Sequence, residues 1–304
     1  MRNSPRILVF GAEGQLGREL QRGFSGLGEM LPCGRGAVDL ASHEQIRKFV
    51  RGATPDIILN AAAYTAVDRA ETEPDLAMVV NGLAPGVLAE EAKRLGALLV
   101  HYSTDYVFDG SRAGAWEETD SPNPLNVYGA SKLAGEQAMM QVGGKILVFR
   151  TSWVYGPRGN NFLMTMLRLG RERDRLNMVD DQVGAPTTTI ELAHATRSIV
   201  DGIFDDRFGS AESWAGIYHM TCGGSVSWCG FAKAIFERAG SLLQGRTPRV
   251  NPIGSREYPT AAKRPQNSVL SNLKLRRCFG INLSSWEEAL DVVTQQLKSA
   301  DQMV

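Results

Sequence analysis

The sequence of 304 residues carries 33 basic and 33 acidic residues, so its formal net charge is zero. A nucleic acid or an acidic membrane surface normally calls for a basic patch, and the sequence has no run of five like charges. Its longest apolar runs are far shorter than the roughly 18 residues of a membrane helix. We therefore expect one or two domains, with neither nucleic acid nor a membrane as partner.

The cysteines and the N-terminus both indicate a cytoplasmic protein. Cys33, Cys222, Cys229 and Cys278 stand at irregular spacings without a CxxC pair, which is typical of reduced thiols rather than of disulfides or a zinc site. The apolar run that begins after Arg6 passes directly into glycines, without the longer apolar stretch and cleavage site of a signal peptide.

Strands and helices alternate regularly through the first half of the chain. A first strand is predicted at 6–10, and after a glycine turn Leu16, Leu20 and Phe24 have helical spacing. Ser42 is a predicted helix cap, and Pro74 suits the first turn of a helix. The further elements expected here are a strand ending at 37–40, a helix at 43–52, a strand at 56–60, a helix at 74–95, a strand at 97–103, a helix at 127–140 and a strand at 145–153.

This order predicts the α/β class, with a doubly wound parallel sheet of the Rossmann type covered by helices on both faces. After Trp153 the glycine, proline and polar content rises and the simple alternation is lost. We expect a dinucleotide-binding domain at 1–152 and a smaller, mixed α/β domain, mainly for the substrate, at 153–304. Within the latter, a helix at 187–201 is expected to pack back on the large sheet.

A glycine turn joins the first predicted strand to the first predicted helix. Gly11, Gly14 and Gly17 follow the first strand and open the helix, with two residues between each successive pair. Glycines in this context let backbone amides and the helix N-terminus approach a pyrophosphate. We predict a dinucleotide cofactor, and a purely structural turn is the alternative.

The end of a second strand, which we read at "LPCGRG" (31–36), bears on which cofactor is used. No acidic residue stands in "LPCGRG", and Arg35 is a candidate partner for a 2′-phosphate. This favours NADPH and leaves NADH open, because Arg35 could equally be a solvated loop cation. Asp39 and Leu40 are expected to flank the adenine.

Tyr128 and Lys132 are four residues apart on a predicted helix, so they project from the same face. An ammonium beside a phenol lowers its pKa, and a positioned tyrosine can protonate the alkoxide that forms when a ketone accepts a hydride. Thr104 and Asp105 follow a predicted strand at the edge of the sheet where open α/β folds hold ligands. Thr104 is therefore expected to reach a substrate oxygen.

These motifs together resemble the extended short-chain dehydrogenase/reductases: GAEGQLG, NAAAYTAVDRAE, HYSTDYVFDG, YGASK and RTSWVYGPRGNNF. DQVGAPT at Asp181 and RPQNSVL at Arg264 extend the resemblance, within that superfamily, to the family of dTDP-4-dehydrorhamnose reductases. It covers nearly the whole chain. The resemblance implies NAD(P)H-dependent reduction of the C4 ketone of dTDP-4-dehydro-L-rhamnose, the last step of dTDP-L-rhamnose synthesis.

The resemblance also implies roles for individual residues. Tyr128 stands at the position of the acid, Lys132 at that of the ribose-binding lysine, and Thr104 at that of the hydroxyl that bonds the carbonyl oxygen. The cofactor contacts it implies are Gly11, Gly14, Gln15, Leu16, Asp39, Leu40, Ala62, Ala63 and Thr65. The candidates for the sugar nucleotide are Asp105, Trp153, Asn161 and Arg264, although Trp153 could be plain core and Arg264 a surface cation.

No metal site is predicted from residue spacing. His43, His101, His194 and His219 form no spaced cluster and are interpreted as structural or surface residues. Some members of the resembled family bind Mg²⁺ through acidic residues at a homodimer interface, which would here involve Glu19 and Glu191. A further acid of that set, near Glu288 or Asp291, has no clear match.

Two other functions fit parts of the pattern. A nucleotide-sugar epimerase of the same superfamily would retain NAD, and the single acid Asp105, followed by Tyr106, argues against a dehydratase but not against an epimerase. A non-catalytic regulatory subunit could be built on the same fold. The presence of Tyr128, Lys132 and Thr104 argues against it.

Overall fold

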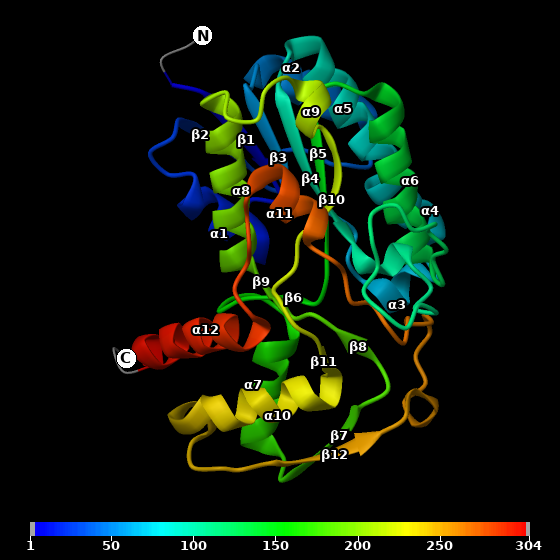
Figure 1. Ribbon diagram of the computed structural model, residues 1–304, viewed down its shortest axis with the longest axis vertical. Helices are drawn as coiled ribbons and strands as arrows, with labels where there is room; N and C mark the ends of the chain where they lie inside the picture. The colour runs from blue at the N-terminus through cyan, green and yellow to red at the C-terminus, as the bar shows by residue number, and fades with distance from the viewer. Residues whose placement is uncertain (1–3, 302–304) are drawn as a thin grey trace.

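A parallel six-stranded sheet forms the centre of the larger lobe of the molecule (Figure 1). The computed structural model describes residues 4–301. The strand order is β10-β5-β4-β3-β1-β2, and every neighbouring pair is parallel. The strands are β1 (Arg6–Phe10), β2 (Glu29–Cys33), β3 (Ile57–Asn60), β4 (Leu98–Thr104), β5 (Ile146–Thr151) and β10 (Gly216–His219).

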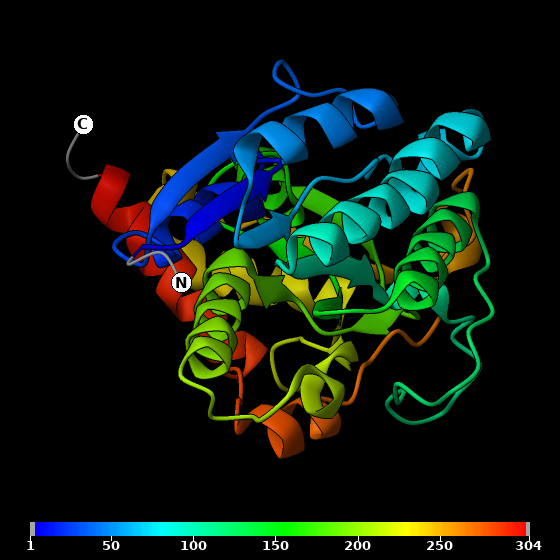
Figure 2. The same cartoon turned by 90° about the horizontal axis from the view of Figure 1, so that it is seen from above.

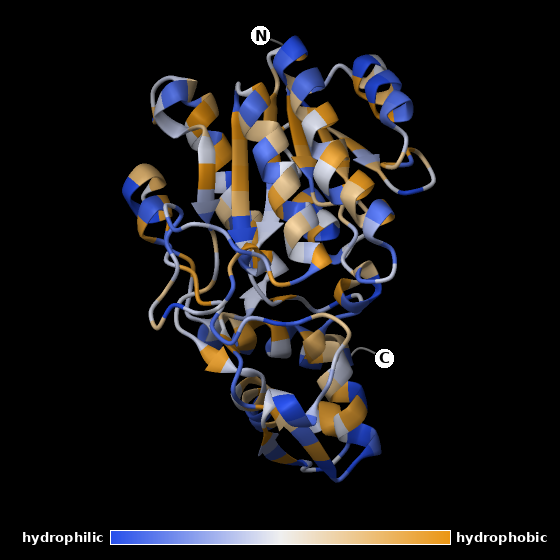
Figure 3. Cartoon of the chain, turned by 90° about the vertical axis from the view of Figure 1, so that its right-hand side faces the viewer, coloured by the Kyte–Doolittle hydropathy of each residue, from blue (hydrophilic) through white to orange (hydrophobic). Residues whose placement is uncertain are grey.

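Helices cover both faces of this sheet, as Figure 2 shows from above. Each face has its own apolar core, one against α1 and α8 and the other against α2, α5 and α6. The central strands are buried along their whole length, and Figure 3 shows them as mostly apolar, with polar residues toward their ends. The predicted doubly wound α/β fold is therefore confirmed. The helices are α1 (Gln15–Gly23), α8 (Thr189–Phe204), α9 (Ala211–Trp214) and α11 (Leu273–Phe279) on one face, and α2 (His43–Ala53), α5 (Ala84–Leu95) and α6 (Val127–Val142) on the other.

The helical segment that begins at Pro74 is continuous but irregular. Pro74 opens α4 (Pro74–Ala77), as predicted, and a π-helical turn at Met78–Leu83 joins it to α5. Asn81, buried in that turn, accepts a hydrogen bond from the Tyr64 amide at 2.8 Å and donates to the Ser131 hydroxyl at 3.1 Å. The wide turn thus ties the loop after β3, with its short α3 (Val67–Ala70), to α6.

One predicted strand is wrong. Residues 37–40 form turns rather than the end of a strand, although Ser42 does cap α2 by accepting from the Gln45 amide. The strand was predicted because Val38 is apolar. Val38 is instead a loop residue, and it is buried in the core beneath α2. Asp39 and Leu40 consequently lie on a loop.

The second half of the chain forms the lower lobe of Figure 1 and also returns to the large sheet. α8 packs against α1, and β10 adds the sixth strand beside β5. The division into domains at 152 and 153 stays a prediction. The lower lobe consists of α7 (Phe162–Glu172), α10 (Trp228–Ala239) and α12 (Trp286–Asp301), the parallel pair β7 (Arg175–Val179) and β12 (Arg249–Ile253), and the short pairs β6 (Val154–Tyr155) with β9 (Thr187–Thr188) and β8 (Val183–Gly184) with β11 (Val226–Ser227).

The sequence analysis made expectations about the cysteines and about membrane-spanning helices. The four cysteines are free thiols, of which Cys278 is half-buried and the other three are buried. Across residues 4–301, none of the helices combines the length and the apolar character that crossing a bilayer demands.

Candidate active site

A crevice of about 780 Å³ opens at the carboxyl ends of the parallel strands. The strand order reverses between β1 and β3, which is where open α/β sheets place ligands. Residues from both lobes line it. The candidate residues found in its lining are Gly11, Gly14, Gln15, Leu16, Arg35, Asp39, Leu40, Ala62, Ala63, Thr65, Thr104, Asp105, Tyr128, Lys132 and Trp153.

The glycine turn fits a bound pyrophosphate. Gly11 has a φ of 73°, and a Cβ built on it would lie 2.8 Å from the Ala62 amide nitrogen, so only glycine is tolerated there. Gly14 precedes α1 without a capping side chain, which leaves amides of the first turn open toward the crevice. Gly17 lies beneath the turn rather than in the lining, because its Cβ would meet the Gly11 carbonyl oxygen at 2.1 Å.

The far end of the crevice is formed by the loop after β2. Arg35 is exposed there, and within residues 4–301 it makes no ion pair. Asp39 is exposed as well and accepts a hydrogen bond from the Ala41 amide at 2.9 Å, which shapes its own turn. A free guanidinium at this place could bind a phosphate group.

Thr104, Asp105 and Tyr128 meet at the centre of the crevice. The Thr104 hydroxyl donates to an Asp105 carboxylate oxygen at 3.0 Å and accepts from the Tyr106 amide at 3.1 Å. Tyr128 lies in the first turn of α6, where the Asn126 side chain caps the helix by accepting from the Gly129 amide at 2.8 Å. A threonine hydroxyl and a phenol are thus presented to the same space.

Burial sets the proton affinities of this centre. It raises the pKa of Tyr128 to about 12, although a hydrogen bond with Thr104 opposes the shift. Burial likewise raises the pKa of Asp105 to about 7, and the second oxygen of this carboxyl group has no hydrogen-bond partner among the described residues. Tyr128 therefore holds its proton at neutral pH, whereas Asp105 titrates there.

Lys132 does not act on Tyr128 in the predicted way. Its Nζ donates to the Tyr102 carbonyl oxygen at 2.6 Å and lies 2.9 Å from Nε2 of His101. The predicted lowering of the Tyr128 pKa is therefore wrong in this arrangement, because desolvation dominates and Nζ of Lys132 is directed toward His101 and Tyr102 instead. Burial in turn lowers the pKa of Lys132 to about 8.

Trp153 forms one wall with a residue that the sequence analysis missed. Its backbone is left-handed, with a φ of 46°, and its indole stacks on Trp228 with ring centroids 3.4 Å apart. Gly184 makes room for this arrangement, since a Cβ there would meet the Trp153 ring at 2.5 Å. Trp228 has no recognisable sequence signal, because it reaches the crevice from α10, far along the chain.

Asn161 and Arg264 are absent from the crevice lining. Asn161 caps α7 and donates from its amide to the Gln15 side-chain oxygen at 3.2 Å, so it positions a crevice residue. Arg264 forms a two-pronged ion pair with Asp68 on α3, at 2.8 and 3.1 Å. Asn161 thus borders the crevice through Gln15, and Arg264 does so through a hydrogen bond with Tyr106, which lines the crevice.

The acidic residues considered for Mg²⁺ have protein partners. Glu19 pairs with Arg22, Glu191 accepts hydrogen bonds from Ser284, Glu288 accepts from Ser285 and Asp291 pairs with Arg238. Within the described part of the chain, no group of three histidine, cysteine or acidic side chains could hold a metal ion. Magnesium is therefore not supported.

A parallel sheet, a glycine turn and a Thr–Tyr–Lys set in one crevice define an NAD(P)H-dependent oxidoreductase of the short-chain dehydrogenase/reductase class. The family model described as "RmlD substrate binding domain" matches residues 5–299. The chain belongs to this family, that of the dTDP-4-dehydrorhamnose reductases.

Individual relatives match over nearly their whole length. The chain is 47% identical to a dTDP-4-dehydrorhamnose reductase of Burkholderia thailandensis, over 97% of this chain and 99% of that one. It is 40% identical to the protein of that name from Escherichia coli K12, over 96% and 97% of the two chains. The solved structure of a dTDP-4-dehydrorhamnose reductase from Bacillus anthracis in complex with NADP has a TM-score of 0.88 and 37% identity, covering 96% of this chain and 99% of that chain.

Proposed function

We propose that the protein reduces the C4 ketone of dTDP-4-dehydro-L-rhamnose to an alcohol, which yields dTDP-L-rhamnose. The single observation that carries this proposal is the identity of 47% with a reductase of that name along almost the entire chain. The crevice with its hydroxyl, phenol and lysine side chains supports it. The location in the cytoplasm and assembly into a homodimer stay predictions.

We propose that the side chains of the crevice divide the work as follows. The reduced nicotinamide cofactor supplies a hydride to the carbonyl carbon. Tyr128 keeps its proton at neutral pH and can pass it to the carbonyl oxygen, so that the ketone becomes an alcohol and the phenol a phenolate. Thr104 orients the oxygen through its hydroxyl, and Lys132 binds the cofactor ribose. Trp153 offers an apolar face to the sugar.

We propose NADPH as the preferred cofactor and NADH as a weaker one. Gly11, Gly14, Gln15 and Leu16 would surround the pyrophosphate, and Ala62, Ala63 and Thr65 would lie along the cofactor. Arg35, exposed and without an ion pair among the described residues, suits the 2′-phosphate that only NADPH carries. The NADP complex of the Bacillus anthracis structure is consistent with this choice.

The proposal is tested by following the near-ultraviolet absorbance of NADPH or NADH in the presence of the purified protein and dTDP-4-dehydro-L-rhamnose. Oxidation that depends on the keto sugar, with dTDP-L-rhamnose as product, is the expected result. NAD that co-purifies with the protein, together with no net oxidation of added cofactor, would instead indicate an epimerase. If the protein neither oxidised the cofactor nor contained bound NAD, the result would favour the non-catalytic regulatory subunit.

A further inference from the structure

His101 is a buried titratable residue to which the proposed mechanism assigns no task. It lies on β4 with 1% of its surface exposed. Its two ring nitrogens face Asn60 at the end of β3 and Lys132 on α6, each at 2.9 Å. The ring thus connects the strand beside the cofactor loop with the lysine of the crevice.

The Asn60 side chain determines which nitrogen of the His101 ring carries the proton. Its Oδ1 accepts a hydrogen bond from the Ala62 amide at 3.2 Å, and a backbone N–H can only donate. Nδ2 of Asn60, which also only donates, therefore faces Nδ1 of His101. Nδ1 must accept this bond, so the proton of a neutral ring sits on Nε2.

The proton on Nε2 points at Nζ of Lys132. Nζ also contacts the Tyr102 carbonyl oxygen at 2.6 Å, to which it must donate. An ammonium would place two donors face to face between His101 and Lys132. A neutral amine accepts from Nε2–H through its lone pair and donates to the Tyr102 carbonyl oxygen. Only the amine form of Lys132 therefore satisfies all the hydrogen bonds that run from Asn60 through His101 and Lys132 to Tyr102.

Among the described residues, no carboxylate forms an ion pair with Lys132. Glu136 on the same helix is occupied by the Arg150 guanidinium at 2.7 Å and by the Ser103 hydroxyl. The other titratable group of α6 near Lys132 is Tyr128, which is neutral. Burial holds the pKa of His101 well below its usual range and lowers that of Lys132 to about 8, although Glu136 opposes the latter shift.

We propose that His101 is a positioning residue that sets the proton occupancy of Lys132: its ring, protonated on Nε2 and held by Asn60, donates to Lys132 and favours the amine form. Lys132 can then gain or lose a proton near neutral pH, which an ion-paired lysine could not do. The link to catalysis rests on the proposed function. The arrangement of protons does not, and it can be measured without substrate or cofactor.

The first test is the tautomer of His101, read by nuclear magnetic resonance of full-length protein labelled with ¹⁵N-histidine. The chain has only four histidines, so His101→Gln identifies the signals by their loss. We expect a bare Nδ1 and a protonated Nε2 that persist between about pH 6 and pH 9. A proton on Nδ1, or on both nitrogens, would overturn the proposal.

The second test uses Asn60→Asp to reverse the direction of the hydrogen bonds that run from residue 60 through His101 to Lys132. A carboxylate at this position still accepts from the Ala62 amide, but it demands a proton on Nδ1 of His101, so that Nε2 becomes an acceptor and favours the ammonium form. We expect the titration midpoint of Lys132, followed through its Cε signals, to rise by about one pH unit. His101→Gln, which can turn a carbonyl oxygen toward Lys132, should raise it as well and covers the case in which Asn60→Asp does not fold. The exposed His194→Gln is the matched control. An unchanged midpoint in the folded variants would refute the role of His101.

Discussion

Tyr128 is the residue on which proton transfer depends in the proposed reaction. With a pKa raised to about 12 it remains a phenol at neutral pH, and it shares a hydrogen bond with Thr104. Tyr128→Phe removes the proton but leaves the ring, so kcat should fall by about 10²- to 10⁴-fold while the Kd for NADPH changes less than about twofold. Steady-state kinetics and fluorescence titration measure the two constants. The exposed Tyr258→Phe is the control, and a wild-type kcat in Tyr128→Phe would contradict the role.

Arg35 provides the test of cofactor preference. If its guanidinium binds the 2′-phosphate, Arg35→Ala should raise the KM for NADPH by about tenfold or more, because a charge-assisted hydrogen bond contributes roughly 1.5–3 kcal/mol. The KM for NADH should stay the same, since NADH lacks that phosphate. Each cofactor serves as control for the other. An equal rise for both cofactors would mean that Arg35 acts on the loop rather than on the phosphate.

Asp105 should make the reaction depend on pH around neutrality. Its raised pKa of about 7 means that the carboxyl group is protonated below this pH and ionised above it. The ionised form accepts the Thr104 proton, which is then withheld from the substrate oxygen, and it places negative charge in the crevice. We therefore expect kcat/KM to fall as the pH rises through about 7, and Asp105→Asn to abolish this step.

The pH dependence that stems from Lys132 serves as an internal control for the Asp105→Asn variant. A change of kcat/KM near pH 8, where Lys132 changes its protonation state, should remain in the variant. If the step near pH 7 persisted after the substitution, another group would be responsible for it.

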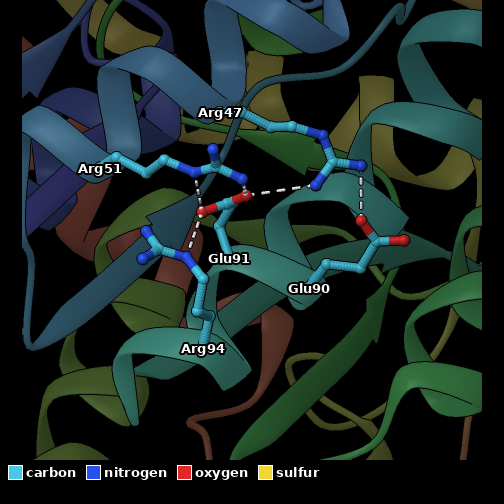
Figure 4. Close-up of polar contacts among 5 residues, drawn as sticks. All are labelled: Arg47, Arg51, Glu90, Glu91 and Arg94. Carbon is cyan, nitrogen blue, oxygen red and sulfur yellow. Dashed lines mark hydrogen bonds and ion pairs between the residues drawn. The ribbon is translucent and has the colours of Figure 1, made fainter.

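At the scale of elements, α2 and α5 are joined by the ion-pair network of Figure 4. The Glu91 carboxylate on α5, with a side chain only 2% exposed, accepts from Arg47, Arg51 and Arg94. These partners, Arg51 foremost, lower the pKa of Glu91 from 4.5 to about 2. Because the folded-state pKa is depressed, the stabilisation is complete above about pH 4.5 and disappears as the pH falls toward 2.

Glu91→Gln should therefore lower the free energy of unfolding by about 2–3 kcal/mol at pH 7, because it removes a buried charge that three cations share. The loss should shrink as the pH approaches 3, where the wild type loses its own advantage. Denaturant unfolding at the two pH values measures both effects. Glu90→Gln is the matched control, since half of that side chain is exposed and the variant should cost less than about 1 kcal/mol. Equal losses in the two variants would contradict the assignment.

Local patterns predicted the elements of the sheet and failed where burial comes from distant contacts. The strands at β1, β3, β4 and β5 were predictable because parallel strands covered on both faces are apolar throughout. Residues 37–40 were not, because Val38 is buried in a loop and imitates a strand. β10 was not expected at all, since it joins the sheet from 216–219, far from its neighbour β5.

The same distinction holds for the crevice. Gly11, Gly14, Thr104 and Tyr128 follow from motifs at fixed offsets from strands and helices, and the structure brings them into one lining. Whether they have the proposed roles stays a prediction. His101 and Trp228 could not be found, because their neighbours Lys132 and Trp153 come from other parts of the chain. Local spacing contains no information on such pairs.

At the scale of the whole molecule, the crevice depends on contacts between the two lobes. Asn161 at the start of α7 bonds Gln15 at the start of α1, and Gln15 in turn donates to the Val154 carbonyl oxygen at 3.4 Å. The stacked Trp153 and Trp228 complete the wall opposite the sheet. Cofactor and substrate would thus meet between the lobes, with the hydride donor on the sheet side.

The central claim is that a hydride passes from the cofactor to C4 of the sugar. It is tested most directly with NADPH that carries deuterium on its transferable position, followed by mass spectrometry and nuclear magnetic resonance of the sugar nucleotide. We predict dTDP-L-rhamnose with deuterium at C4 and one NADP formed for each molecule of product. A product without deuterium, or the absence of any product that depends on NADPH, would contradict the claim.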